Sequence, residues 1–317
     1  MMFEKYVLYF EEYLKISNYS ESTIFNYKMY LNEFVLFIEK YYPRIQTLQK
    51  ITKDIIIDYQ NNLVEQKNRK GEPLSNSTKI FKLKSIKKFF LYLVKNDYLL
   101  NDPSSAITMP KQERKLIRNV LTEKEVFELL ANSKLTNPIS IRNRAIIELF
   151  YGCGIRTSEL CNLRIEDVDL QEQTVTVVKG KGGKSRLIPI GQYSCYYIKL
   201  YLKKARNKLL KYQKKDPGKL FLSYRGKPFN KTSINKNVIR QVLRNVNIKK
   251  HVSCYTFRHS VATHLLKNNV DIMYIAQLLG HSSLKTTQQY LKIEISDLKK
   301  MHSLYHPRER ITIGGKK

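Results

Sequence analysis

Apolar and aromatic residues recur every three or four positions through the first hundred residues, which is the spacing of one face of an α-helix. The segment 3–16 shows this spacing first. Serine and threonine residues that suit helix N-caps precede the later apolar faces. We predict a small bundle of four or five helices without a strand, whose later members begin after Ser20, after Thr52 and at Ser77 or Thr78, the last running to about Lys95.

The pattern changes in the second half of the chain, where helical faces surround one pair of β-type segments. Residues 173–179 and 184–190 are rich in β-branched side chains and flank a glycine-rich turn, which predicts a β-hairpin. Further helices are predicted from Thr122, over 140–151, from about Thr157, and over 194–212, 232–247, 256–268, 271–279 and 283–291. The fold class is therefore mainly α with a small β-sheet, a helical bundle followed by an α+β domain.

Two neighbouring polar stretches mark a boundary between two predicted domains. Residues 101–105 form turns readily, and residues 109–115 are polar and basic with few apolar anchors. A length of 317 residues suits about two domains. We predict a helical domain over residues 1–103, a linker over 104–118, a larger domain over 119–300 and a basic tail over 301–317.

The net charge points to a polyanionic partner. The chain holds 57 basic and 27 acidic side chains, a formal charge of +30, which favours nucleic acid. Residues 1–110 hold 16 basic and 12 acidic residues, so most of the excess lies beyond residue 110. On charge alone, a lysine-rich composition without a binding role stays open as an alternative.

Cysteine usage and hydropathy indicate the compartment. The four cysteines form no CxxC pair and have no histidine at metal-ligand spacing, so they indicate packing residues of a reduced, cytoplasmic protein. No signal peptide and no apolar run of about 18 residues is present, and we therefore expect no membrane association.

Basic side chains gather on two predicted elements. The fourth helix has an inward stripe that includes Leu83 and Phe90, and lysines occupy much of its remaining surface with almost no acid to offset them. The hairpin is basic on both strands. We predict phosphate contacts from both elements, through Lys79, Lys82, Lys84, Lys87 and Lys88 on the helix and Lys179, Lys184 and Arg186 on the hairpin.

Two basic residues of the second domain have positions that suit chemistry. Arg156 follows two glycines at a helix start, and Glu159 lies three residues on, hence on the same face. Lys181 sits at the hairpin tip between glycines, where a P-loop is excluded because the glycine-rich motif lacks its spacing and a strand follows it. A solubilising turn and a finger that touches DNA both stay open for this hairpin.

Three further candidates lie near the C-terminus. Tyr255 and Arg258 are three residues apart and share a helix face, with Arg258 expected off the core side. Gly280 is a predicted C′ residue that ends a helix and puts His281 at an exposed corner. A short helix then carries Tyr290. Each residue alone is weak evidence for catalysis.

In their order along the chain these residues resemble the tyrosine recombinase (phage integrase) family, most closely its bacterial Xer type. The nine-residue step from His281 to Tyr290 is the family's own. The resemblance covers about residues 120–291 and, more loosely, the N-terminal bundle, which corresponds to the family's core-binding domain. The matching motifs are GIRTSEL around Arg156, GKGGKSR around Lys181, TFRHSVATHLL around Arg258 and LLGHSSLKTTQQY from Leu278 to Tyr290.

The resemblance implies a mechanism. Tyr290 is the nucleophile that forms a 3′-phosphotyrosyl link, and Lys181 protonates the leaving 5′-oxygen. Arg156 and Arg258 clamp the phosphate, assisted by His281 and supported by Glu159. It further implies double-stranded DNA as substrate and a homo-tetramer on two duplexes, with a paralogous recombinase as a further partner. No cofactor and no metal are implied.

One position departs from the family, which usually has histidine three residues before the second arginine. This chain has Tyr255, and a phenol is a weak proton acceptor at neutral pH. Tyr255 keeps the capacity to donate a hydrogen bond to a phosphate oxygen. The proton acceptor therefore stays unassigned.

Other classes of protein compete with this interpretation. The acidic cluster Glu166, Asp167 and Asp169 is local, whereas a two-metal nuclease needs carboxylates from separate elements. A type IB topoisomerase uses a similar residue set without strand exchange, and an architectural DNA-binding protein needs no catalysis. Chromosome-dimer resolution and integration or excision of a mobile element both stay open.

Overall fold

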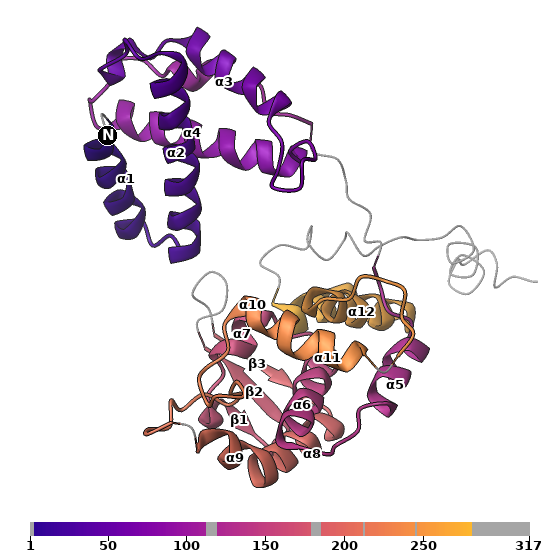
Figure 1. Cartoon of the computed structure of the whole chain (residues 1–317). Helices are drawn as coiled ribbons and strands as arrows, with labels where there is room; N and C mark the ends of the chain where they lie inside the picture. Colours follow the sequence, from indigo (N-terminus) through magenta and orange to yellow (C-terminus); the bar gives the residue numbers. More distant parts are fainter. Residues whose placement is uncertain (1–2, 112–118, 179–184, 212, 245, 281–317) are drawn as a thin grey trace, which may run out of the picture. The chain divides into compact units, whose positions relative to one another are not determined.

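The computed structural model describes residues 3–111, 119–178, 185–211, 213–244 and 246–280. The chain divides into two compact units, Met1–Lys115 and Leu116–Lys317, each with its own hydrophobic core. Figure 1 draws the helices and strands of both units. The predicted helix over 283–291 and the tail over 301–317 lie outside the described residues.

The first unit is a helical bundle without a regular strand among its described residues, as predicted. Its core is aromatic: the ring of Phe34 packs edge-on against Tyr59, with the ring centroids 5.0 Å apart. Ser20 caps the second helix by accepting a hydrogen bond from the backbone N–H of Thr23. The elements are α1 (Glu4–Ile16), α2 (Glu21–Tyr41), α3 (Lys53–Glu65) and α4 (Asn76–Lys95), with 3₁₀ turns at Leu48–Lys50 and Pro103–Ala106.

Helix α4 buries its predicted stripe, since Leu83 and Phe90 are 1% and 0% exposed. Lys82 does not fit the prediction that it contacts phosphate. Its side chain is buried, and its ammonium group forms an ion pair with Glu33 and donates to Gln66 at 2.8 Å. Lys82 therefore bonds within the bundle and does not offer its charge to a phosphate. Lys84 is exposed, and Lys79, Lys87 and Lys88 are half-buried.

The segment after residue 103, predicted to begin the linker, packs on the first unit. Ser104 is fully buried, and Ile107 lies in the aromatic core. Gln60 exchanges two hydrogen bonds with the backbone of Thr108. These contacts attach the chain to α3 after the last long helix, so an interdomain connection starts later than the turn-forming sequence indicates.

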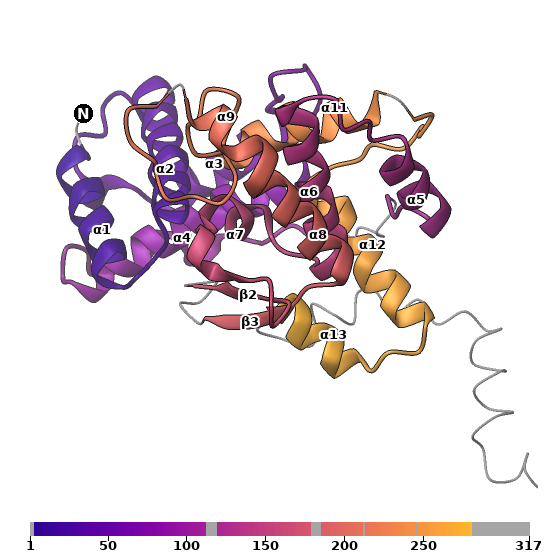
Figure 2. The same ribbon diagram turned by 90° about the horizontal axis from the view of Figure 1, so that it is seen from below.

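The second unit is a helical domain built around α6 and a small sheet, as Figure 2 shows. Ala145, Ile146 and Leu149 of α6 are fully buried in its core. Two of the long predicted helices contain wider π-type turns, at Leu202–Arg206 and Asn235–Ile239. The helices are α5 (Glu123–Ala131), α6 (Pro138–Cys153), α7 (Thr157–Asn162), α8 (Gln192–Tyr201), α9 (Asn207–Leu210), α10 (Lys231–Ile234), α11 (Arg240–Leu243), α12 (Cys254–Lys267) and α13 (Ile272–Leu279), with a 3₁₀ turn at Ile165–Asp167.

The sheet has three antiparallel strands in the order β1-β2-β3. They are β1 (Val168–Asp169), β2 (Thr174–Val177) and β3 (Arg186–Pro189). Strands β2 and β3 pair from Thr174 and Pro189 to Val177 and Arg186, the pair nearest the turn, so the predicted hairpin is confirmed. Strand β1 was not predicted, because two residues are too few to show an alternating pattern. Among the described residues, no helix is long and apolar enough to cross a membrane.

Candidate active site

The first half of the site is the turn between α6 and α7. Gly154 ends α6 in the left-handed conformation, with φ of 60°, and Arg156 precedes the first residue of α7. Glu159 accepts hydrogen bonds from the backbone N–H of Arg156 at 2.9 Å and from its guanidinium at 2.8 Å. The predicted relation between Arg156 and Glu159 is therefore present.

The second half comes from α12, which Ser253 caps by accepting from the backbone N–H of Thr256. Arg258 of this helix is only 2% exposed, so the expectation that it lies off the core side is wrong. Its guanidinium donates to the carbonyl of Gly154 at 2.7 Å and to that of Leu279 at 2.5 Å. A buried arginine is tolerated at this position because these carbonyls satisfy its N–H groups.

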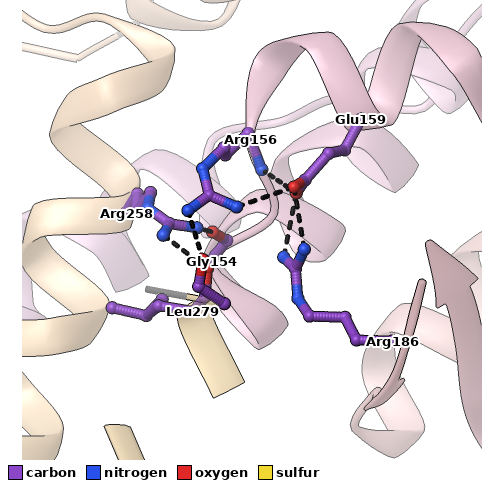
Figure 3. A network of polar contacts seen from close by, with 7 residues as sticks. Gly154, Arg156, Glu159, Arg186, Arg258 and Leu279 are labelled. Atoms are coloured by element: carbon purple, nitrogen blue, oxygen red, sulfur yellow. Dashed lines mark hydrogen bonds and ion pairs between the residues drawn. The ribbon is translucent and has the colours of Figure 1, made fainter. Parts of the chain in front are cut away.

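The two arginines meet at the end of α13. Gly280 ends this helix with φ of 63°, as its sequence position predicts. Arg156 donates to the carbonyl of Gly280 at 2.5 Å, next to the Leu279 carbonyl that Arg258 uses. Terminal helix carbonyls lack partners within the helix and carry partial negative charge, which suits guanidinium groups. Figure 3 shows Arg156 and Arg258 directed at the same turn.

Arg186 of β3 joins the same network. Its two terminal nitrogens donate to the two carboxylate oxygens of Glu159, at 2.8 and 2.9 Å. Arg186 was predicted to contact DNA, but in the structure its charge is directed at a carboxylate of the same chain. Burial raises the pKa of Glu159, but hydrogen bonds from Arg186 and Arg156 outweigh it and hold the pKa at about 2.

The charge of the network favours an anion. Two guanidinium groups, those of Arg156 and Arg186, share the single carboxylate of Glu159, and the third, that of Arg258, donates to backbone carbonyls. The side chain of Arg156 is 21% exposed, and two of its five N–H donors are used within the described part of the chain. This arrangement can bind a phosphate bidentately.

Tyr255 lies one turn before Arg258 and is 57% exposed. Its ring meets that of His259 edge-on, with centroids 4.1 Å apart. His259 is nearly buried, and its pKa is lowered to about 4 by burial and by the charge of Arg258. His264 has a structural role, because its ring contacts the hydroxyl of Tyr151 at 3.0 Å and the carbonyl of Leu121 at 2.8 Å.

Several predicted residues lie outside the described part of the chain: Lys179, Lys181, Lys184, His281 and Tyr290. Within the described part, Arg156, Glu159, Arg258 and Arg186 are brought together. Sequence reasoning missed the backbone carbonyls that orient the arginines. The signal was present in the sequence, because Gly154 and Gly280 each end a helix and so leave carbonyls open. No group of three His, Cys, Asp or Glu side chains that could hold a metal occurs among the residues described.

Comparison with known proteins agrees with this geometry. Residues 119–296 match the model of the phage integrase family, and residues 7–97 match the phage integrase N-terminal SAM-like domain. Tyrosine recombinase XerC of Halalkalibacterium halodurans is 36% identical over 308 residues, which cover 96% of this chain and 98% of that protein. Tyrosine recombinase XerD of Staphylococcus haemolyticus is 34% identical over 302 residues, which cover 94% of this chain and 98% of the relative.

Solved structures share the fold. The crystal structure of XerH bound to a palindromic difH substrate has a TM-score of 0.69 at 20% identity, over 95% of each chain. XerA recombinase is 28% identical, with a TM-score of 0.51 over 96% of this chain and 99% of that one. The chain therefore belongs to the phage integrase family and is a tyrosine-type site-specific DNA recombinase. The predicted resemblance and the predicted fold class are confirmed. These comparisons favour a recombinase over a topoisomerase or an architectural DNA-binding protein.

Proposed function

We propose that Tyr290 attacks a DNA phosphodiester held by Arg156 and Arg258, giving a 3′-phosphotyrosyl link and a free 5′-hydroxyl. Lys181 protonates the leaving oxygen, and His281 hydrogen-bonds the phosphate. The observation that supports this most is the attachment of both arginines to one turn. Arg156 donates to Gly280 and Arg258 to Leu279, at the point where the chain continues to residue 281.

The physical role of the arginine pair follows from charge. A phosphodiester carries one negative charge, and its pentavalent transition state gains another. Guanidinium groups that are already oriented stabilise that added charge without reorganisation, and one such donor contributes about 3–4 kcal/mol in comparable sites. Glu159 supports the pair by fixing Arg156 from the opposite side. The covalent link conserves the energy of the phosphodiester bond, so rejoining needs no ATP.

We assign Tyr255 as a hydrogen-bond donor to a non-bridging oxygen and not as the base. Its exposed side chain on the helix of Arg258 is consistent with that role. Neither Tyr255 nor the nearly buried His259 suits the acceptor role at neutral pH. His259 has a lowered pKa and lies beside the charge of Arg258. The proton of Tyr290 therefore goes to neither of these two side chains.

The substrate is double-stranded DNA. The relatives named XerH are described with a difH substrate, and this chain carries a charge of +30. The N-terminal unit contacts phosphates through α4, with Lys84, Lys79, Lys87 and Lys88 as the contacting residues and Lys82 excluded by its burial. We place the DNA-binding domain before the segment 112–118 and the catalytic domain after it.

The assembly proposed is a homo-tetramer on two duplexes in the cytoplasm, with a paralogous recombinase as a further partner. Relatives named XerC and XerD match with almost equal identity, so similarity does not assign the chain to one of these two types. Chromosome-dimer resolution and integration or excision of a mobile element are both proposed roles.

A two-duplex assay tests the proposal. Covalent adducts formed on genomic DNA of the source organism are mapped, and two labelled duplexes carrying a mapped site are incubated with the protein. We expect strands exchanged between the duplexes. Relaxation of a supercoiled plasmid without exchange would indicate a topoisomerase-like activity, and binding without any covalent adduct would indicate an architectural protein.

A further inference from the structure

Arg186 closes a ring of contacts that joins three elements of the second unit. Its guanidinium binds both oxygens of Glu159, and Glu159 binds Arg156. Arg156 in turn donates to the carbonyl of Gly280, and Gly280 lies against the Arg186 guanidinium. A Cβ atom placed on Gly280 would stand 2.7 Å from Cζ and Nε of Arg186. Strand β3, the start of α7 and the end of α13 therefore meet at Arg186.

This position leaves Arg186 little freedom. Its side chain is 17% exposed and that of Glu159 is 5% exposed. The Nε atom of Arg186 is buried without a hydrogen-bond partner among the described residues. An unpaired buried donor is unfavourable, so the paired contact with Glu159 determines the orientation of the guanidinium. Only a planar, two-pronged donor can bind both carboxylate oxygens in this way.

We propose that Arg186 is a positioning residue for the arginine pair of the recombinase site. It acts through Glu159 on Arg156, and through its contact with Gly280 on the turn that supplies carbonyls to Arg156 and Arg258. This inference rests on the proposed function, because it concerns the same phosphate clamp. It replaces the sequence-based expectation that Arg186 contacts DNA.

A phosphate contact and a positioning role predict different results for the variant Arg186→Gln. A phosphate contact contributes to binding, and its loss lowers the slope of log K against log salt by about 1. A positioning residue leaves that slope and the affinity unchanged, and its loss slows cleavage, since a small displacement of a catalytic group costs up to about 100-fold. We expect Arg186→Gln to cleave about 10- to 100-fold more slowly than the wild type. Arg186→Lys should recover little of the lost cleavage rate, because an ammonium cannot bind both oxygens of Glu159.

The measurements are single-turnover cleavage of a nicked duplex that carries a mapped site, and binding of the same duplex over a salt series. Arg164→Gln is the matched control. Arg164 also pairs with a glutamate, Glu166, but both side chains are largely exposed, at 59% and 71%. Such a surface pair contributes little, and this variant should cleave at the wild-type rate.

A neutral substrate separates positioning of the arginines from a general structural defect. Replacing one non-bridging oxygen of the scissile phosphate by a methyl group removes the ground-state charge, so the transition state depends less on the guanidinium pair. The loss caused by Arg186→Gln should therefore be clearly smaller on the methylphosphonate than on the phosphodiester. A defect in folding would reduce both rates by the same factor.

A double variant tests the route through Glu159. Groups that act through one another are non-additive, so Arg186→Gln should cause a smaller loss in a Glu159→Gln background than it causes in the wild type. The proposal is overturned by a reduced salt slope, by an unchanged cleavage rate, by equal losses on both substrates or by additive losses in the double variant. If the wild type itself forms no covalent adduct, the proposed function fails, and that outcome is distinct from these four.

Discussion

The guanidinium of Arg258 donates a hydrogen bond to the carbonyl of Gly154, which lies 104 residues earlier in the chain. Its other terminal nitrogen donates to Leu279, 21 residues later. Arg258 therefore links the end of α6 to the end of α13 through these two hydrogen bonds. The same side chain belongs to the proposed phosphate clamp, so folding and catalysis depend on it together.

Arg258→Ala should reduce both activity and stability. We expect cleavage to fall about 100- to 1,000-fold, as for loss of a preoriented donor, and stability to fall by about 1–3 kcal/mol, because buried carbonyls lose their partner. Tyr255→Phe on the same helix is the comparison, and its cleavage should fall less than about tenfold. Single-turnover cleavage and urea unfolding measure both effects. Equal losses of cleavage in the two variants would give Tyr255 a catalytic role larger than proposed.

Gly154→Ala should destabilise the second unit through a collision with α13. A Cβ atom at Gly154 would lie 2.5 Å from Cδ2 of Leu279, and φ is 60°. Gly218→Ala is the matched control, because Gly218 has φ of 69° but no atom within 4 Å. Both variants carry the strain of the left-handed conformation, so their difference isolates the collision. We expect Gly154→Ala to cost about 1–3 kcal/mol more in urea unfolding, and equal costs would contradict this packing.

His259 should make stability depend on pH. Its pKa in the folded protein is about 4, against an ordinary value of 6.5. The unfolded chain therefore binds the proton first as pH falls. The contribution of the neutral ring is fully present above about pH 6.5 and is lost as pH falls toward about 4. Between about pH 7 and pH 5 we expect the wild type to lose about 1–2 kcal/mol more than His259→Gln. Parallel pH profiles of the two proteins in urea unfolding would refute the assignment.

Lys82 and Lys84, two residues apart on α4, should respond oppositely to substitution by glutamine. Lys82→Gln removes a buried ammonium group that pairs with the partly exposed Glu33, and it should cost about 1–3 kcal/mol in stability, with the salt slope of DNA binding unchanged. Lys84 is exposed, and Lys84→Gln should leave stability within about 0.5 kcal/mol while lowering that slope by about 1. The reverse result would show that the burial of Lys82 does not determine which lysine contacts phosphate.

Much of the fold follows from local patterns. The helices of the bundle, the hairpin at Val177 and Arg186 and the end of α13 at Gly280 are encoded by spacing, turn chemistry and capping within a few residues. These features depend on neighbours in sequence, which a single chain displays. The placement of Arg156 and Arg258 in one site does not, and it followed from the resemblance to the tyrosine recombinase family.

The partners of charged side chains could not be predicted in the same way. Lys82 and Arg186 were expected to contact DNA, and Arg258 was expected to lie off the core side. In the structure each of the three meets a partner far away in sequence. Position along a helix or strand alone cannot tell a solvated cation from one that is buried beside a carboxylate or a carbonyl, because the difference arises only when elements pack. Tertiary contacts therefore decided these three cases.

The central claim is that Tyr290 is the nucleophile, and identifying the residue attached to DNA tests it most directly. The covalent adduct is digested with nuclease and trypsin, and the modified peptide is sequenced by mass spectrometry. The chain has 22 tyrosines, and trypsin releases Tyr290 as the sole tyrosine of the segment 286–292. We expect the nucleotide on this peptide, and no adduct from Tyr290→Phe although that variant still binds DNA. A nucleotide on any other tyrosine, or an adduct that persists in Tyr290→Phe, would contradict the assignment.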